Sequence, residues 1–225
     1  MKKKPADRRP GFSRGPRVLI VEDHPILRRG LKDILAAAHP RAVIGEAGDS
    51  RTACETLRRK TWDVMLLDLN LPGRGGLELL EDARQLAPET RVLVVSVYPE
   101  EEFAVRAFKL GAAGYLMKTR TPEELVQALD TILEGRTYVS PGLAERLAAA
   151  LGEKAAGRCP ADVLSIRELQ VLRLIAKGQT IKNIAAELAL SEKTIATYRA
   201  RLAEKTRLAS NVQLTRYAFQ HGLDA

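Results

Sequence analysis

Four short apolar runs in this chain each end in a polar residue that could take part in phosphoryl or metal chemistry. The run Val64–Leu67 ends at Asp68, and Pro72 and Gly73 follow shortly after. A continuous apolar run of this length, closed by proline and glycine, is typical of a strand buried on both faces of a parallel sheet. The Asp68 carboxylate would then project from the carboxyl end of the strand, where open α/β sheets place their ligand sites.

The other three runs end in the same way. The polar residues that follow them are Glu22 and Asp23, Ser96, and Lys118. Because the carboxyl ends of parallel strands share one edge of a sheet, we expect these side chains to gather around Asp68. Each acid alone would more simply be a helix cap or a solvated side chain, but their joint occurrence at successive strand ends favours one functional pocket.

A cluster of three carboxylates calls for a cation, because neighbouring acids raise one another's pKa when nothing compensates their charge. Carboxylate oxygens suit Mg²⁺, which keeps several waters and is commonly held by a few carboxylates together with phosphate. Lys118 would add a point charge and Ser96 a hydroxyl, and both can contact a phosphoryl group. The predicted chemistry is therefore magnesium-assisted handling of phosphate.

Alternating strands and helices must position these residues. We expect strands over residues 17–21, 42–46, 64–67, 91–95 and 114–117, and helices over residues 25–35, 49–59, 77–86, 100–110 and from 121 onward. Thr121, Pro122 and two acids form a typical helix start, and Gly111 is a typical helix end. Five strand–helix units in alternation predict an α/β fold with a five-stranded, doubly wound parallel sheet.

Three motifs in this region resemble the receiver domain of a bacterial two-component response regulator, which has a flavodoxin-like fold. They are VLIVEDHP at 18–25, LDLNLPG at 67–73 and GYLMK at 114–118. The resemblance implies that Asp68 is the phospho-acceptor and that a sensor histidine kinase is the phosphoryl donor. It also implies that Lys118 contacts the phosphoryl group and that Ser96 and Tyr115 occupy the switch positions. The alternative for Tyr115 is a core residue of its strand, and its switch role depends on the resemblance.

The same resemblance implies a Mg²⁺ site. Its ligands would be Glu22, Asp23, Asp68 and the backbone carbonyl of Asn70, with Asp23 the more direct ligand of the acidic pair. Glu22 stands where the family often has aspartate, which is a tolerated change. His24 lies beside the acids, but we interpret it as a helix start and not as a metal ligand.

From Leu164 onward the apolar spacing changes to that of a small helical domain. Ser165 and Glu168 fit a capping box. Further helices are expected over residues 181–190, 191–206 and 211–221. The short turn between the helices at 181–190 and 191–206 is typical of a helix-turn-helix, whose second helix enters the major groove of DNA.

The segments LSIRE at 164–168 and LSEKTIATYR at 190–199 resemble the LuxR-type DNA-binding domain. Together with a receiver, they are similar to the NarL/FixJ family over about residues 17–223, which implies a homodimer on paired half-sites of double-stranded DNA. The implied DNA-binding residues are Lys193, Thr194, Ala196, Thr197, Arg199, Ala200 and Arg201. Alanine at 196 and 200 departs from the commoner pattern, and alanine cannot hydrogen-bond a base, so the target sequence cannot be derived.

Charge and composition support this division of the chain. The predicted parts are a basic disordered tail (1–16), a receiver (17–137), a linker with a short helix (138–162) and the DNA-binding domain (163–225). Residues 1–17 contribute +6 to the net charge of +8, residues 160–225 contribute +4, and the remainder contributes −2. The tail could be a solubilising leader or an arm attracted to DNA or to a membrane.

Several absences in the sequence indicate a cytoplasmic protein without a membrane partner. No apolar run approaches the roughly 20 residues that span a bilayer, and no apolar stretch before Arg17 resembles a secretory signal. Cys54 and Cys159 fit no metal or redox spacing and are expected to be reduced thiols.

Two rival functions stay open at this stage. The first is a phosphatase with an aspartate nucleophile and Mg²⁺, but such enzymes usually carry a second acid two residues after the nucleophile, where this chain has Asn70. We therefore expect a regulator and not an enzyme. The second is a regulator whose DNA binding does not depend on phosphorylation, which an intact acidic site makes less favoured.

Overall fold

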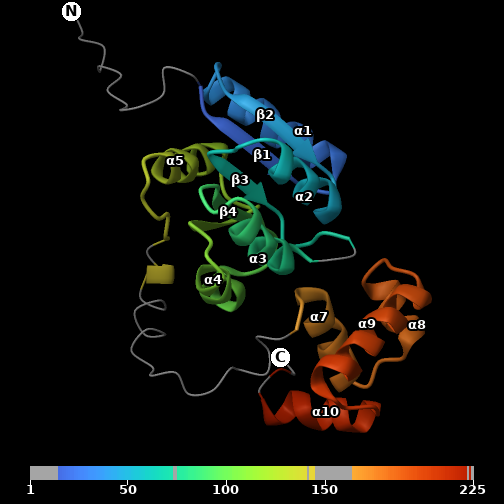
Figure 1. The fold of residues 1–225 in the computed structure, drawn as a ribbon. Coiled ribbons are helices and arrows are strands. Elements are labelled where there is room, and N and C mark those ends of the chain that lie inside the picture. Colours follow the sequence, from blue (N-terminus) through green and yellow to red (C-terminus); the bar gives the residue numbers. More distant parts are fainter. Residues whose placement is uncertain (1–14, 73–74, 141, 145–163, 222, 224–225) are drawn as a thin grey trace, which may run out of the picture.

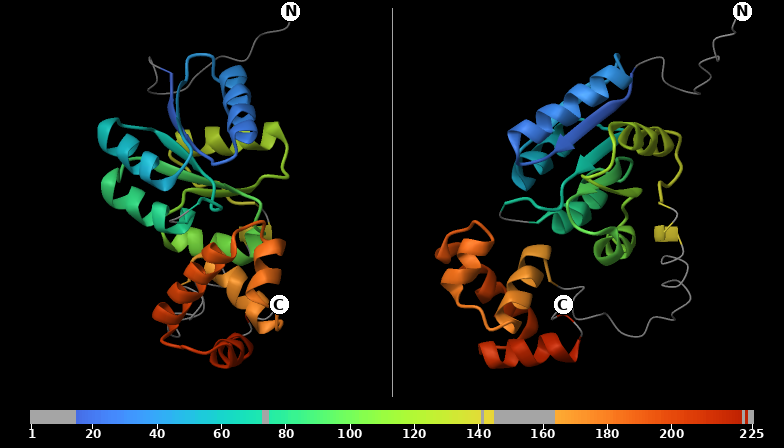
Figure 2. Two further views of the ribbon diagram at one scale, coloured as in Figure 1. Left: turned by 90° about the vertical axis from the view of Figure 1, so that its right-hand side faces the viewer. Right: turned by 180° about the vertical axis from the view of Figure 1, so that it is seen from behind.

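The structure is a computed structural model that describes residues 15–72, 75–140, 142–144, 164–221 and 223. An α/β part and a helical part are distinct, and helix α7 is the element of the helical part that lies nearest to α3 and α4 (Figures 1 and 2). None of the helices in the described ranges combines the length and the apolar character needed to cross a bilayer.

The α/β part is built on one sheet of five parallel strands in the order β2-β1-β3-β4-β5. The strands are β1 (Arg17–Val21), β2 (Val43–Ala47), β3 (Val64–Leu67), β4 (Arg91–Ser96) and β5 (Gly114–Met117). This order confirms the predicted doubly wound sheet. Strand β3 is central and buried along its whole length, which agrees with its continuous apolar sequence.

Helices cover both faces of the sheet, and the alternation of side chains along each strand divides the core into two layers. The helices are α1 (Pro25–Ala38), α2 (Ser50–Arg59), α3 (Gly76–Leu86), α4 (Glu100–Lys109) and α5 (Pro122–Leu133). Val64 and Leu66 pack with residues of α1 and α5. Met65 and Leu67 pack with residues of α2, α3 and α4 on the opposite face.

Local sequence explains where several helices begin. The Asp49 carboxylate accepts a hydrogen bond from the Thr52 amide at 2.7 Å and so caps α2. Thr121 caps α5 in the same way, with Pro122 at the first helical position. Gly111, with φ of +103°, follows α4 in a backbone conformation that favours glycine.

The single tryptophan of the chain belongs to the receiver-like part. Trp62 is 5% exposed, and its indole ring lies against Gly45 of β2. A Cβ atom at position 45 would come within 2.2 Å of the ring, so glycine is needed there to admit the indole. Trp62 is therefore a buried reporter of this half of the chain.

The helical part consists of α7 (Ile166–Ala176), α8 (Ile181–Glu187), α9 (Glu192–Thr206) and α10 (Asn211–Gln220). Ser165 and Glu168 form the predicted capping box at the start of α7. Helix α8 ends at Glu187, so the expectation that it continues to residue 190 is wrong. Ala189 has φ of +51°, which breaks the helical backbone before α9 begins.

The predicted domain boundaries fall partly outside the described residues, which include neither 1–14 nor 145–163. The first part of the predicted linker packs on the sheet domain. The Tyr138 amide donates to the Ala113 carbonyl at 2.9 Å, Ser140 donates to Glu100 at 2.7 Å, and Leu143 is 1% exposed.

Candidate functional site

The predicted pocket forms at the carboxyl ends of β1, β3 and β5. Asp68 is 2% exposed, and its Oδ2 atom accepts a hydrogen bond from Lys118 Nζ at 2.8 Å. The same ammonium group lies 2.6 Å from Glu22 Oε2. The Asn70 amide donates to Asp68 Oδ1 at 3.1 Å, which fixes the carboxylate at the start of its loop.

Burial controls the protonation of the central acid. Burial raises the pKa of the Asp68 carboxyl, and the Lys118 ammonium opposes this effect. An opposing cation is needed because the ionised form is the nucleophilic one. Lys118 therefore keeps a buried carboxylate available for attack on an electrophile such as phosphorus.

The acidic pair has the donor set of a cation site. Glu22, Asp23, His24 and Asp68 each present one ligand atom, and these atoms lie within 4.8 Å of one another. Glu22 Oε2 and Asp23 Oδ1 are buried and accept no hydrogen bond from the described residues. They are close instead to cationic or ionisable groups, Lys118 Nζ at 2.6 Å and His24 Nδ1 at 2.7 Å. The carboxylate oxygens fit a hard divalent ion such as Mg²⁺.

His24 begins α1, as its sequence predicted, and it also contacts both acids. Its backbone amide and its Nδ1 atom lie 3.1 Å and 3.0 Å from Glu22 Oε1. The hydrogen bond with Glu22 and the charge of Asp23 raise the pKa of His24. This histidine therefore acts as a partial counter-charge to the acidic pair.

The two predicted switch residues lie next to the pocket and are fully buried. Ser96 and Tyr115 are both 0% exposed. The Ser96 hydroxyl oxygen accepts a hydrogen bond from the Tyr98 amide at 3.2 Å, and the Tyr115 hydroxyl donates to the Tyr98 carbonyl at 2.9 Å. Burial raises the pKa of Tyr115, which therefore stays a neutral donor. Both residues thus hold the backbone of Tyr98.

The loop that follows Asp68 needs glycine at its far end. The Gly76 amide donates to the Leu69 carbonyl at 3.1 Å, which folds α3 back onto the loop. A Cβ atom at position 76 would lie 2.4 Å from the Asp68 carbonyl oxygen. Only glycine, which has no Cβ atom, allows the chain to pass this close to Asp68.

The predicted DNA-facing residues lie along α9. Ile195, Leu202 and Tyr198 face inward, with exposures of 0%, 0% and 7%. The residues with exposed positions are Lys193, Ala196, Thr197, Ala200 and Arg201, and Thr194 is half-buried. The 3- and 4-residue spacing of Ile195, Tyr198 and Leu202 places all three on one side of α9.

Arg199 differs from its exposed neighbours because other residues of the domain hold its guanidinium. Its Nε atom donates to Asn211 Oδ1 at 2.8 Å, and Nη2 donates to the Ala209 carbonyl at 3.2 Å. Arg199 thereby ties α9 to the start of α10. Its assignment as a phosphate contact stays a prediction.

Comparisons with known proteins agree with both halves of this geometry. Residues 18–130 match the family described as response regulator receiver domain, and residues 162–218 match the bacterial regulatory proteins of the luxR family. The response regulator GacA of Pseudomonas aeruginosa is 37% identical over 207 residues, covering 92% of this chain and 97% of that protein. The chain belongs to the LuxR-type response regulators.

Two further relatives extend this result. The response regulator UvrY of Escherichia coli is 34% identical over 206 residues, covering 92% of this chain and 94% of that protein. A solved structure of the Salmonella typhimurium response regulator RcsB has a TM-score of 0.53 and 26% identity, and covers 90% of this chain and 97% of that chain. The chain is thus a DNA-binding transcription regulator controlled through a receiver domain.

The two domains of this response regulator contact each other through polar groups that the sequence did not reveal. The domain contacts join Arg106 Nη1 to the Leu164 carbonyl at 2.5 Å, Arg173 Nη1 to Glu102 Oε2 at 3.0 Å, and Lys205 Nζ to Glu78 Oε1 at 3.8 Å. Such pairs link residues far apart in sequence and give no periodic signal, so sequence patterns could not have identified them.

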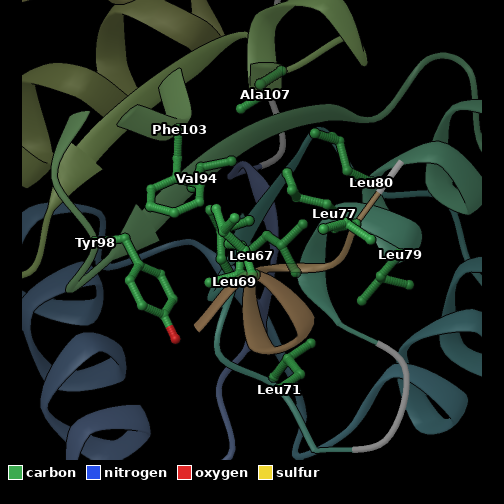
Figure 3. Packing of buried hydrophobic residues seen from close by; sticks show 14 of the residues in the cluster. Leu67, Leu69, Leu71, Leu77, Leu79, Leu80, Val94, Tyr98, Phe103 and Ala107 are labelled. Atoms are coloured by element: carbon green, nitrogen blue, oxygen red, sulfur yellow. The ribbon is translucent and has the colours of Figure 1, made fainter. Parts of the chain in front are cut away.

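Apolar side chains complete the domain contact. Leu69 and Leu71, in the loop after β3, line one small pocket together with Ile166 and Tyr198 of the DNA-binding domain. The same apolar cluster includes Tyr98 and Phe103, with Tyr98 at its edge (Figure 3).

Proposed function

We propose that Asp68 accepts a phosphoryl group from a phosphohistidine of a sensor kinase, and that this modification controls binding of the α9 helix to DNA. The observation that carries the assignment is a buried carboxylate paired with Lys118 at 2.8 Å, beside the acids at 22 and 23. Asp68 lies at a strand end, and the charge of Lys118 favours its ionised form, which is the form that acts as a nucleophile.

In the transfer step, an Asp68 carboxylate oxygen forms a bond to phosphorus while the bond between phosphorus and the donor imidazole nitrogen breaks. The electron pair of that bond returns to the imidazole, which takes up a proton. Lys118 and the Ser96 hydroxyl would contact the transferred oxygens. Ser96 ends β4, which is next to β3, and Lys118 follows β5, which is next to β4.

We propose Glu22, Asp23, Asp68 and the backbone carbonyl of Asn70 as the ligands of Mg²⁺. A bound Mg²⁺ would neutralise the charge that accumulates where carboxylates and phosphoryl oxygens meet. Ligand atoms of Glu22, Asp23 and Asp68 that lie within 4.8 Å of one another support this set. The Lys118 ammonium group contacts both Glu22 and Asp68 and so orients the two carboxylates.

On the DNA side, we propose that Ala196, Thr197 and Ala200 face base edges, and that Lys193, Arg199 and Arg201 contact phosphates, with Thr194 at the helix start. A homodimer on paired half-sites follows from helix-turn-helix geometry. We place the protein in the cytoplasm, where a histidine kinase domain and the chromosome are both accessible to it. A sequence with two alanines on the reading face would depend strongly on thymine methyl contacts and DNA shape.

The direct test compares Asp68→Asn with Asp33→Asn, because Asp33 is an exposed acid of α1 that lies outside the pocket. Both variants and the wild type are incubated with Mg²⁺ and radiolabelled acetyl phosphate, and the labelled protein is quantified. We expect labelling to be lost in Asp68→Asn alone. Undiminished labelling of Asp68→Asn would overturn the assignment of the acceptor.

A phosphatase is the rival in another functional class. The second acid that such phosphatases usually carry is replaced here by Asn70. Its backbone amide donates to Asp68 Oδ1, and its side-chain oxygen accepts a hydrogen bond from the Tyr98 hydroxyl at 3.3 Å. An amide cannot activate water as a general base. We therefore expect a phospho-protein that outlasts the labelling reaction, and sustained turnover of phosphomonoesters would favour the phosphatase.

The remaining rival is a regulator whose DNA affinity ignores phosphorylation. The affinity for genomic DNA fragments, measured with and without acetyl phosphate, separates the two hypotheses. The salt concentration is held fixed because contacts with DNA phosphates make the affinity salt-dependent. Equal affinities would favour the rival. The contacts between the receiver and the DNA-binding domain give phosphorylation of the receiver a route to the DNA-binding domain.

A further inference from the structure

His24 points toward the acidic pair of the phosphorylation site, although the helix that it begins does not need its side chain. It is the residue before α1, and its side chain makes no capping hydrogen bond. Serine, threonine, aspartate and asparagine usually cap helices, because their side-chain oxygens accept hydrogen bonds from the first amides. The imidazole is therefore available for another role, and its Nδ1 atom faces Glu22 and Asp23.

The distances from this nitrogen to the two carboxylates match the spacing of neighbouring ligands on one metal ion. Nδ1 lies 2.7 Å from Asp23 Oδ1 and 3.0 Å from Glu22 Oε1. Ligand atoms about 2.1 Å from an octahedral ion are about 3.0 Å apart when adjacent and about 4.2 Å apart when opposite. The ligand atoms of Glu22, Asp23, His24 and Asp68 lie within 4.8 Å of one another, so small shifts bring all four around an ion.

The two oxygens of Glu22 have different partners, which leaves one of them for the ion. Oε2 lies 2.6 Å from Lys118 Nζ. Oε1 faces His24, whose backbone amide donates to it at 3.1 Å. An ion bound between Glu22 Oε1 and His24 Nδ1 would therefore leave the contacts of Lys118 with Glu22 and Asp68 in place.

The histidine can adjust to an ion more easily than the acids can. The side chain of His24 is 61% exposed, whereas Glu22 and Asp68 are buried. A half-turn of an exposed ring displaces no packed neighbour, and rotation of exposed side chains is fast. The buried acids thus provide a fixed part of the site, and the imidazole provides a movable part.

A nitrogen ligand changes which cation the site prefers. Mg²⁺ takes oxygen ligands and keeps several waters, whereas imidazole suits Ni²⁺, Zn²⁺ and other first-row transition ions. Carboxylates and a backbone carbonyl alone supply oxygen only. The nitrogen of His24 is therefore the feature of this site that can distinguish a transition ion from Mg²⁺.

We propose that His24 is a fourth side-chain ligand of the metal site, and that it adds a preference for a divalent transition ion such as Ni²⁺ over Mg²⁺. The inference rests on the proposed metal site at Glu22, Asp23 and Asp68, and it departs from the sequence-based expectation that His24 only begins a helix. Nδ1 coordinates the ion through its lone pair, and the ring proton lies on Nε2. On Mg²⁺ a water molecule takes the place of the imidazole.

The test measures the binding of Ni²⁺ and of Mg²⁺ separately, by isothermal titration calorimetry on the full chain at one fixed pH. The wild type is compared with His24→Asn, because asparagine is a favoured helix cap and offers no imidazole nitrogen. His221→Asn is the matched control, since it removes a histidine at the end of α10 in the other domain. The readout is the ratio of the Ni²⁺ and Mg²⁺ dissociation constants.

For His24→Asn we expect the Ni²⁺ affinity to fall by at least about tenfold, because even residues that only orient a ligand are worth about 10–100-fold in metal affinity. The Mg²⁺ affinity should change by less than about twofold, since water fills the vacated position. His221→Asn should leave the ratio of the two constants unchanged.

A role as counter-charge alone predicts a different result. Removing a positive charge beside the acids would tighten the binding of both ions alike, because the charge repels every divalent cation. The ratio of the two dissociation constants would then stay at the wild-type value. An unchanged ratio in His24→Asn would overturn the inference.

A second variant keeps the test decisive if the amide oxygen of asparagine itself binds the ion. His24→Ser also places a favoured cap at the start of α1, and its side chain is shorter than that of asparagine. We expect the same loss of Ni²⁺ affinity in this variant. Wild-type Ni²⁺ affinity in His24→Ser would contradict coordination by the imidazole.

Failure of the inference is distinguishable from failure of the proposed metal site. If Asp23→Asn weakens the binding of both ions while His24→Asn leaves their ratio unchanged, the acids hold the metal and the imidazole does not. If Asp23→Asn leaves the binding of both ions unchanged, the proposed metal site itself fails, and the inference fails with it.

Discussion

Replacement of Lys118 by methionine should be costly for folding as well as for phosphotransfer. Lys118 Nζ lies 2.8 Å from Asp68 Oδ2 and 2.6 Å from Glu22 Oε2, and these acids are 2% and 1% exposed. Removing the ammonium group leaves two buried carboxylates without their shared cation. Breaking a buried ion pair in this way typically costs about 3–5 kcal/mol, so we expect a loss in that range for Lys118→Met.

Denaturant unfolding of the full chain, followed by fluorescence, can measure this loss. Trp62 is the single tryptophan and is buried in the receiver, so its emission reports the unfolding of that domain. The measurement is made in EDTA, where no divalent ion compensates the acids. Lys109→Met, on the exposed side of α4, is the matched control and should change stability by less than about 0.5 kcal/mol.

Two additions sharpen the test of Lys118. Added Mg²⁺ should reduce the loss in free energy of unfolding caused by Lys118→Met, because a bound cation restores positive charge between the acids. Combining Lys118→Met with Asp68→Asn should recover at least about 1 kcal/mol, since one uncompensated charge is removed. A deficit below about 1 kcal/mol in EDTA would show that Lys118 does not compensate these carboxylates, and would refute the reasoning.

Three further predictions follow from described contacts. Because burial raises the pKa of Asp68, the wild type should lose stability as pH rises through that pKa, and Asp68→Asn should not; thermal unfolding in EDTA between about pH 4 and 8 measures the difference. Gly76→Ala places a Cβ atom 2.4 Å from the Asp68 carbonyl oxygen, so it should lower the free energy of unfolding by about 1–3 kcal/mol and slow the labelling of Asp68. In its control, Gly30→Ala on helix α1, the new Cβ atom meets nothing within 4 Å, so urea unfolding should show unchanged or increased stability. Arg201→Ala should weaken DNA binding for all sequences alike and reduce the slope of log affinity against log salt by about 0.9, as a titration of affinity with salt would reveal.

Much of the receiver could be predicted because its signals are local. Four of the five strands are short apolar runs, and Asp49 and Thr121 are recognisable helix caps. The convergence of Asp68 and Lys118 follows from the parallel order of the strands alone, because parallel strands that alternate with helices bring their carboxyl ends to one edge. The motif positions then specify which polar residues meet.

The features that sequence did not predict depend on distant partners or on backbone strain. The Tyr98 hydroxyl bonds to Asn70, 28 residues before it. The early end of α8 depends on the positive φ of Ala189, a residue that ordinarily favours helix. The tether of Arg199 to α10 depends on how two helices cross, and no periodic pattern encodes that angle.

The ion pairs between the domains make ionic strength act on this regulator in two opposite directions. Dissolved salt screens Arg173 from Glu102 and Lys205 from Glu78, which frees the reading helix, while the same salt weakens every phosphate contact that the helix makes. If phosphorylation of Asp68 parts these interdomain pairs, the unphosphorylated chain should show a shallower salt dependence of DNA binding than the phosphorylated chain. At raised ionic strength, the unphosphorylated protein would then lose less of its DNA binding than the loss of phosphate contacts alone would cause.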